Sequence, residues 1–162
     1  MNNFLDLINE AVNFYYKSVV EDYDDISSFA IVTDEGFECF QIAVNRNRFF
    51  ADLINEDSED VLDWCDEDFW NTGYWSYEDL TPIYNFPKMN DISNILEQNS
   101  LTDDFLCHTF LNALMKIRDK DNKDICMFVH KTDSSFDERL FEIVKKLNGD
   151  EVAESYREYY DS

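Results

Sequence analysis

The chain has 162 residues, and its 36 Asp and Glu against 13 Lys and Arg give a formal net charge of −23 at pH 7. Hydrophobic residues at 44% and aromatic residues at 16% exclude a disordered acidic chain, because they are numerous enough to build a packed core. The charge argues against nucleic acid and against anionic membranes as ligands, since both are negatively charged themselves. At this length, a single domain over residues 1–162 is the simplest organisation.

The N-terminus and the cysteines indicate the compartment. No basic region precedes an apolar run, and Asp6 and Glu10 interrupt the start of the chain, so no secretory signal is expected. No apolar stretch approaches the about 20 residues that a membrane-crossing helix needs. The cysteines lack the close spacing of a zinc site or a disulfide framework, and we expect reduced, mostly buried thiols in a cytoplasmic protein. They are Cys39, Cys65, Cys107 and Cys126.

The first predicted element is an amphipathic helix over residues 3–21, where apolar residues recur at helical spacing. Two runs of strand character follow. Residues 29–33 are apolar and partly β-branched, and residues 37–44 alternate along the chain. These runs predict a β-hairpin over residues 28–44, in which Gly36 is expected to take the positive φ that such a turn often needs.

The middle of the chain predicts three helices. Asn45 can cap a helix over residues 46–56. Residues 91–98 have the pattern of a short helix. The run Ser100-Leu101-Thr102-Asp103 matches a capping box, and it precedes a helix whose inner apolar stripe extends over residues 106–117.

The last third adds a strand and two helices. Residues 125–129 form a continuous apolar run, which predicts a strand over residues 125–130 that is suited to the centre of a sheet. A helical pattern from residue 136 stops near Gly149, and residues 152–160 form a last helix. The order of the elements predicts an α+β fold, with a small, mainly antiparallel sheet (the hairpin plus this strand) flanked by helices.

The sequence contains no pattern that is typical of catalysis or of metal binding. The three glycines are isolated, so neither a phosphate-binding loop nor a dinucleotide-binding loop can be formed. Neither His108 nor His130 is placed to form a Cys-His pair within contact distance. Residues 119–124 resemble the start of a calcium loop, but Asp124 and His130 stand where that loop needs Gly and Glu. We therefore expect no catalytic residues, no metal and no cofactor.

The most informative stretch covers residues 49–87, which contain eleven Asp or Glu, no Lys or Arg, and all three tryptophans. Trp and Tyr often anchor protein interfaces, and a dense negative field accelerates encounter with a basic partner. We predict a docking surface for a basic protein; the alternative is an acidic solubilising loop beside a core built from the aromatic residues. The predicted contact residues are Glu56, Asp57, Glu59, Asp60, Asp63, Trp64, Asp66, Glu67, Asp68, Trp70, Tyr74, Trp75, Tyr77, Glu78 and Asp79.

Two motifs resemble an uncharacterised bacterial domain family, and the resemblance spans nearly the whole chain. Residues 29–34 have its aromatic-Ala-hydrophobic-hydrophobic-Thr-Asp pattern. The family's Trp-rich stretch, which ends in an aromatic-Glu pair, is matched here by Trp64, Trp70 and Trp75 with Tyr77-Glu78. Such families occur among the immunity proteins of bacterial polymorphic toxin systems. The resemblance implies a small cytoplasmic partner that occludes a toxin domain, and it carries over no catalytic residue.

Three hypotheses follow from these observations. The first is an immunity-type protein that binds a basic toxin domain, which we expect to be a nuclease because nucleases have basic grooves for phosphates. The second is an acidic adaptor or regulatory protein for another basic partner, unrelated to toxins. The third, an enzyme that uses carboxylates alone, is the least favoured.

Overall fold

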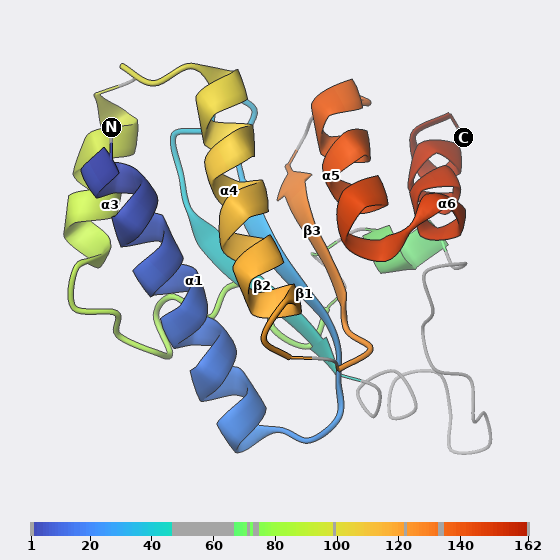
Figure 1. Ribbon diagram of the computed structural model, residues 1–162, viewed down its shortest axis with the longest axis horizontal. Helices are drawn as coiled ribbons and strands as arrows, with labels where there is room; N and C mark the ends of the chain where they lie inside the picture. Colours follow the sequence, from blue (N-terminus) through green and yellow to red (C-terminus); the bar gives the residue numbers. More distant parts are fainter. Residues whose placement is uncertain are drawn as a thin grey trace.

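The computed structural model describes residues 2–46, 67–70, 72, 75–98, 100–121, 123–132 and 135–161. In this part of the chain, helices pack around a three-stranded sheet, and the predicted α+β fold is confirmed (Figure 1). The elements in chain order are α1 (Asn2–Asp22), β1 (Ile26–Thr33), β2 (Gln41–Arg46), the 3-10 helix η1 (Glu67–Trp70), α3 (Met89–Glu97), α4 (Asp103–Arg118), β3 (Cys126–Lys131), α5 (Glu138–Asn148) and α6 (Asp150–Asp161).

The sheet has the strand order β2-β1-β3. The predicted hairpin is present, because β1 and β2 pair antiparallel. β3 pairs parallel with β1, since the chain crosses over through α3 and α4 before it returns to the sheet. The sheet is therefore mixed. The central position belongs to β1, and the run at residues 125–129, predicted to suit the centre, lies on an outer strand.

The two faces of the sheet are covered differently. Helices α1, α4 and α5 lie on one face (Figure 1), where the ring of Tyr16 from α1 meets Phe29 of β1 edge-on at a centroid distance of 5.4 Å. Successive residues of a strand point to opposite faces, so Phe128 of β3, which aligns with Ala30, points to the other face. There it packs against the rings of Trp70 and Trp75, which belong to and follow η1.

The hairpin turn differs from its prediction. β2 begins at Gln41 rather than at residue 37, and Phe37, not Gly36, has the positive φ, at 57°. The Phe37 side chain is fully buried beside Phe110. Burial of a phenylalanine contributes about 1.5–3 kcal/mol, which offsets the about 1–2 kcal/mol that a left-handed backbone costs.

The segment after β2 also departs from its prediction. Asn45 and Arg46 are strand residues, paired with Ser28 and Ile26, so Asn45 does not cap a helix that starts at residue 46. Its side-chain oxygen instead accepts hydrogen bonds from the Arg46 amide and from Ser76. The rest of the predicted helix, residues 47–56, lies outside the described residues.

Helix ends are set by local hydrogen bonds. Thr102 caps α4, and its Oγ1 accepts from the Phe105 amide at 3.3 Å; the cap is thus two residues later than the predicted Ser100, because Thr102 has the extended backbone that a cap requires. Asp137 caps α5 by accepting from the amide of the second residue of the helix. Gly149, at a φ of 95°, ends α5 as predicted.

Candidate functional site

The predicted docking segment divides into two parts. Its acidic part, with Glu56, Asp57, Glu59, Asp60, Asp63, Trp64 and Asp66, lies outside the described residues, and so does Tyr74. Glu67 and Asp68 belong to η1. The structure therefore describes the side chains of Trp70, Trp75, Tyr77, Glu78 and Asp79, which it distributes between the core and the surface.

Trp70 and Trp75 are core residues, with 1% and 3% of their surface exposed. The Trp75 indole donates to the carbonyl oxygen of Phe69 at 2.7 Å, and the Trp70 indole donates to Ser155 at 3.3 Å. Both rings meet Phe128 edge-on. The prediction of exposed anchors at these two positions is corrected: the large apolar indoles cover the sheet face opposite the helices, as the alternative interpretation held.

Tyr77 is different, because its ring is only half-buried and its hydroxyl contacts other polar groups. Its backbone exchanges two hydrogen bonds with Val44, which attaches this segment to β2. The hydroxyls of Tyr77 and Tyr23 lie 2.7 Å apart. The Arg46 guanidinium lies over the Tyr23 ring at 4.3 Å from its centroid and donates from Nε to Asp25 at 2.8 Å.

A third tyrosine continues this group. The Tyr84 hydroxyl donates to Asp22 at 2.5 Å, and the pKa of Tyr84 is raised by burial first and by this hydrogen bond second. The pKa of Tyr23 is raised mainly by its hydrogen bond with Tyr77. Beside Tyr84, Ile83 is the large hydrophobic side chain that the described surface exposes, at 55%. We call Tyr23, Tyr77, Tyr84 and Ile83 the tyrosine patch.

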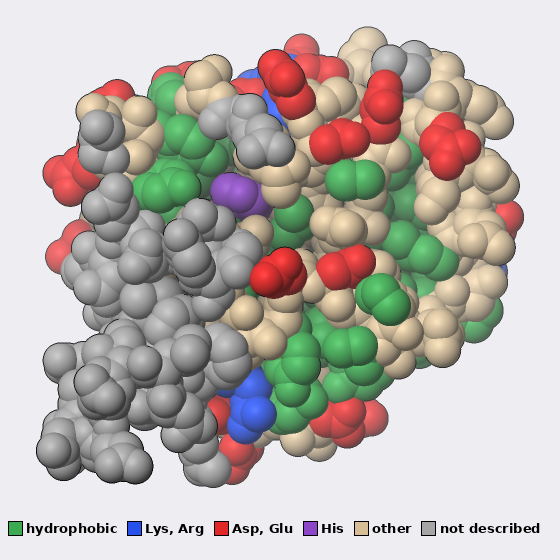
Figure 2. Space-filling view, turned by 180° about the vertical axis from the view of Figure 1, so that it is seen from behind, with side chains coloured by type: hydrophobic (Ala, Val, Ile, Leu, Met, Phe, Trp, Pro, Cys, Tyr) green, Lys and Arg blue, Asp and Glu red, His purple; other side chains and the backbone are tan. Residues whose placement is uncertain are grey.

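Figure 2 shows the molecule from behind, with the sheet face that lies away from α1, α4 and α5. In Figure 2, hydrophobic side chains, with tyrosine counted among them, are exposed between carboxylates on this face. The exposed acids nearest the tyrosine patch in sequence are Asp22, Asp24 and Glu78, while Asp79 is half-buried and accepts from the amide and hydroxyl of Thr81. Tyr77 and Glu78 are therefore the predicted contact residues that remain accessible among those described.

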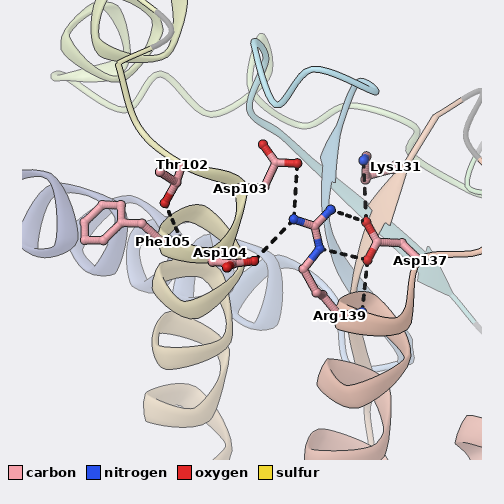
Figure 3. A network of polar contacts seen from close by, with 7 residues as sticks. All are labelled: Thr102, Asp103, Asp104, Phe105, Lys131, Asp137 and Arg139. Atoms are coloured by element: carbon pink, nitrogen blue, oxygen red, sulfur yellow. Dashed lines mark hydrogen bonds and ion pairs between the residues drawn. The ribbon is translucent and has the colours of Figure 1, made fainter.

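A second polar cluster lies at the other end of the sheet, where β1 and β3 finish (Figure 3). Arg139 donates to both carboxylate oxygens of Asp137, at 2.7 and 3.0 Å, and reaches across to Asp103 and Asp104 in the first turn of α4. Lys131 lies 3.6 Å from Asp137. Because Arg139 donates to it, the pKa of the Asp137 carboxyl is lowered.

This cluster has a structural role. Its two cations are matched by three carboxylates within the cluster, and the pairing ties the start of α5 to the start of α4. The sequence analysis did not find it, since Asp103 and Arg139 are 36 residues apart in the chain. The pattern predicts a helix from residue 136, whereas α5 begins at Glu138 and Asp137 caps it, so the preference of Asp for cap positions was the only local signal.

The other described His and Cys side chains lie apart from one another. His108 is exposed on α4, whereas His130 is buried in β3. Burial raises the pKa of the Cys107 thiol to about 11, so that it is protonated at neutral pH and a poor nucleophile. Within the described ranges, no three His, Cys, Asp or Glu side chains are grouped to hold a metal ion. None of the described helices combines the length and apolar character that a membrane crossing requires.

Comparison of the chain with protein-family models, with curated proteins and with solved structures found no match.

Proposed function

We propose that the protein is an immunity-type binding protein, which acts in the cytoplasm and neutralises a basic toxin domain through an acidic, aromatic-containing surface. The observation that carries this proposal is the surplus of carboxylates, 36 against 13 basic side chains. Six of the basic side chains already pair with carboxylates of the protein itself. They are Arg46, Lys88, Lys131, Arg139, Lys145 and Arg157.

A surface of this charge suits a partner with a basic groove. A single-sign field raises the rate at which an oppositely charged protein is encountered, by factors of about 10 to 1,000. A nuclease toxin needs cations to hold phosphates, and carboxylates can occupy those positions in place of the phosphates. Binding of this kind blocks the toxin by occlusion and requires neither turnover nor a cofactor.

The contact residues divide by role. Residues 56–68 contribute the long-range attraction, because eight of these thirteen residues are acidic. Trp70 and Trp75 stabilise the fold rather than contact the partner, since both are buried. Tyr77 and Glu78 are accessible and follow this segment within about ten residues of the chain. Trp64 and Tyr74 keep their predicted place as contacts.

The test uses the protein encoded by the neighbouring gene, since an immunity gene is expected directly downstream of its toxin gene. Asp57, Asp60, Asp63 and Asp66 are changed together to Asn. We expect association to slow by about tenfold or more at low salt, and its salt dependence to flatten, because charges at the rim of an interface act mainly on the on-rate. Association and dissociation rates are measured by surface plasmon resonance.

The matched control removes the same charge from another part of the surface. Asp6, Asp91, Glu158 and Asp161 are exposed, and their change to Asn or Gln is expected to slow association much less. Equal effects of the two sets would show that only net charge matters. Absence of a complex, with cells that express the toxin dying equally with and without this protein, would reject the proposal.

The second candidate function is an acidic adaptor or regulatory protein for a basic partner unrelated to toxins. The same surplus of carboxylates favours it, because charge attracts any basic surface. A neighbouring gene whose product harms no cells, together with a tight complex with another basic protein of the host, would favour this candidate over the first.

A further inference from the structure

We infer that the tyrosine patch (Tyr23, Tyr77, Tyr84 and Ile83) is the docking surface for an arginine-bearing segment of the basic partner. The inference rests on the proposed function and adds to it the place and the chemistry of the contact. The patch brings together β2, the C-terminal end of α1 and residues 77–84, and Arg46 at its edge is the last described residue before the acidic segment of the chain.

The first argument is that the patch already holds one guanidinium. Arg46 lies over the Tyr23 ring at 4.3 Å, with the Asp25 carboxylate 2.8 Å from its Nε. An arginine is thus bound between a ring face and a carboxylate. This is the arrangement in which cation–π attraction and a charge-assisted hydrogen bond act together, with the former worth about 0.5–2 kcal/mol.

The second argument is that the same two components recur at the exposed side of the patch. Tyr84 donates to the exposed Asp22, and its half-buried ring stands beside the exposed Ile83. Tyr77 is half-buried next to Glu78. Tyr and Arg are the side chains most enriched at energetically dominant interface positions, and a half-buried tyrosine loses little conformational entropy when a partner covers it.

The charges around the tyrosine patch are complementary to those of a basic partner. Asp22, Asp24 and Glu78 are exposed around the patch, whereas its own Arg46 is neutralised by Asp25. A pocket of about 260 Å³ also opens beside Tyr23. That volume leaves room for one side chain. The pocket is lined by Tyr23, Asp24, Ile26, Lys123, Asp124 and Ile125.

Another acidic groove serves as the natural comparison. A hollow of about 430 Å³ between α1 and α3 is lined by Asp6, Glu10 and Asp91, but Lys88 already lies within it and bonds to Glu10 at 2.6 Å. None of the described residues that line this groove is aromatic. It offers charge without a ring face, so we expect it to attract arginine less strongly than the tyrosine patch does.

The test uses the full chain and an oligo-arginine peptide as the probe, at physiological salt. Amide chemical shifts are followed by NMR during the titration, and affinity is measured by calorimetry. We expect the largest shift changes at the tyrosine patch. Tyr84→Ala should weaken binding about three- to tenfold, whereas Tyr84→Phe, which keeps the ring, should change it less than about twofold.

Charge-matched pairs separate the patch from general electrostatics. Asp22→Asn with Glu78→Gln is expected to weaken binding several-fold more than Asp6→Asn with Asp91→Asn, although each pair removes the same charge. If the patch serves only to hold residues 77–84 on α1, Tyr84→Ala should alter the unfolding midpoint of the protein and leave its affinity for the peptide unchanged. That result would overturn the inference.

Two further outcomes separate this inference from the proposed function. The peptide could bind with chemical shift changes confined to residues 56–68, or binding could depend mainly on Asp6 and Asp91. Either result would reject the tyrosine patch as the docking surface and would still agree with a basic partner. Absence of any oligo-arginine binding would overturn the inference as well, and a complex with the neighbouring gene product would then show that the proposed function survives without it.

Discussion

Residues 49–87 contribute aromatic side chains to two groups, one around Phe128 and the other in the tyrosine patch. The two groups differ in burial and in the partners of their polar atoms. Around Phe128, Trp70 and Trp75 are buried and each indole donates one hydrogen bond inside the protein. In the tyrosine patch, Tyr77 and Tyr84 are half-buried and their hydroxyls face charged or polar partners near solvent. A run of aromatics among acids therefore contains both core and surface residues, and the side chain with the larger apolar area is the one that becomes buried.

The largest expected effect is a loss of stability in the buried group. Trp70→Ala removes an indole that contacts Phe128 and Tyr156, and it should lower the free energy of unfolding by about 3–5 kcal/mol. Urea denaturation followed by circular dichroism measures the change. Tyr84→Ala is the control from the tyrosine patch. A loss of stability in Trp70→Ala no larger than that in the control would remove the distinction between the two groups.

The second prediction concerns the buried hydrogen bond of Trp75. Trp75→Phe keeps a ring against Phe128 but deletes the donor to the Phe69 carbonyl oxygen, which lies 2.7 Å away. We expect a loss of about 1–3 kcal/mol, because a buried carbonyl is left without a partner and some volume is lost. A neutral result in the same denaturation assay would indicate that solvent reaches this carbonyl and that the buried group is less tightly sealed.

The elements that the sequence predicted well depend on contacts within a few residues. The 3.6-residue spacing of α1, the strand character of β1 and the stop of α5 at Gly149 can all be read locally, and each is present. What could not be read is pairing over long separations. Tyr23 and Tyr77 are 54 residues apart, and Tyr84 and Asp22 are 62 apart, so nothing in either neighbourhood predicts that they meet.

The errors have the same origin. The parallel pairing of β3 with β1 depends on how α3 and α4 cross the sheet, which a list of predicted elements does not contain. Phe37 takes the left-handed backbone in place of Gly36 because its ring fills a space beside Phe110. In both cases tertiary packing, and not the local sequence, decided the outcome.

The third prediction concerns the coupling free energy between the Tyr23 and Tyr77 hydroxyls in the tyrosine patch. Tyr23→Phe and Tyr77→Phe each remove one of two hydroxyls that lie 2.7 Å apart. In a double-mutant cycle we expect a coupling free energy of about 0.5–1 kcal/mol, at the low end for hydrogen bonds because solvent competes for both groups. A coupling above about 2 kcal/mol would mean that this pair is as sealed as the indoles around Phe128.

The last prediction concerns tyrosine substitutions that have the smallest effect on stability at neutral pH. They distinguish the two groups through unfolding at alkaline pH. The pKa of Tyr156, in the buried group, is raised mainly by burial, and the pKa of Tyr84 is raised by burial and by its bond with Asp22. A raised folded-state pKa contributes stability that is present below the unfolded value of about 10 and is lost as pH rises through the folded value. Tyr156→Phe should therefore move alkaline unfolding to higher pH.

Tyr84→Phe is the matched variant for this measurement and should shift that transition less, since Tyr84 is only half-buried and its pKa is raised less than that of Tyr156. Tyrosinate absorbance and circular dichroism are followed together through the titration. We expect the Tyr156 hydroxyl to ionise only as the fold is lost, so that the part of the tyrosinate absorbance that disappears in Tyr156→Phe coincides with the loss of the native circular dichroism. Ionisation of Tyr156 in the native range would contradict the assignment of its ring to the sealed group, because a charged phenolate cannot stay among Trp70, Phe136 and Tyr160 without a large desolvation cost.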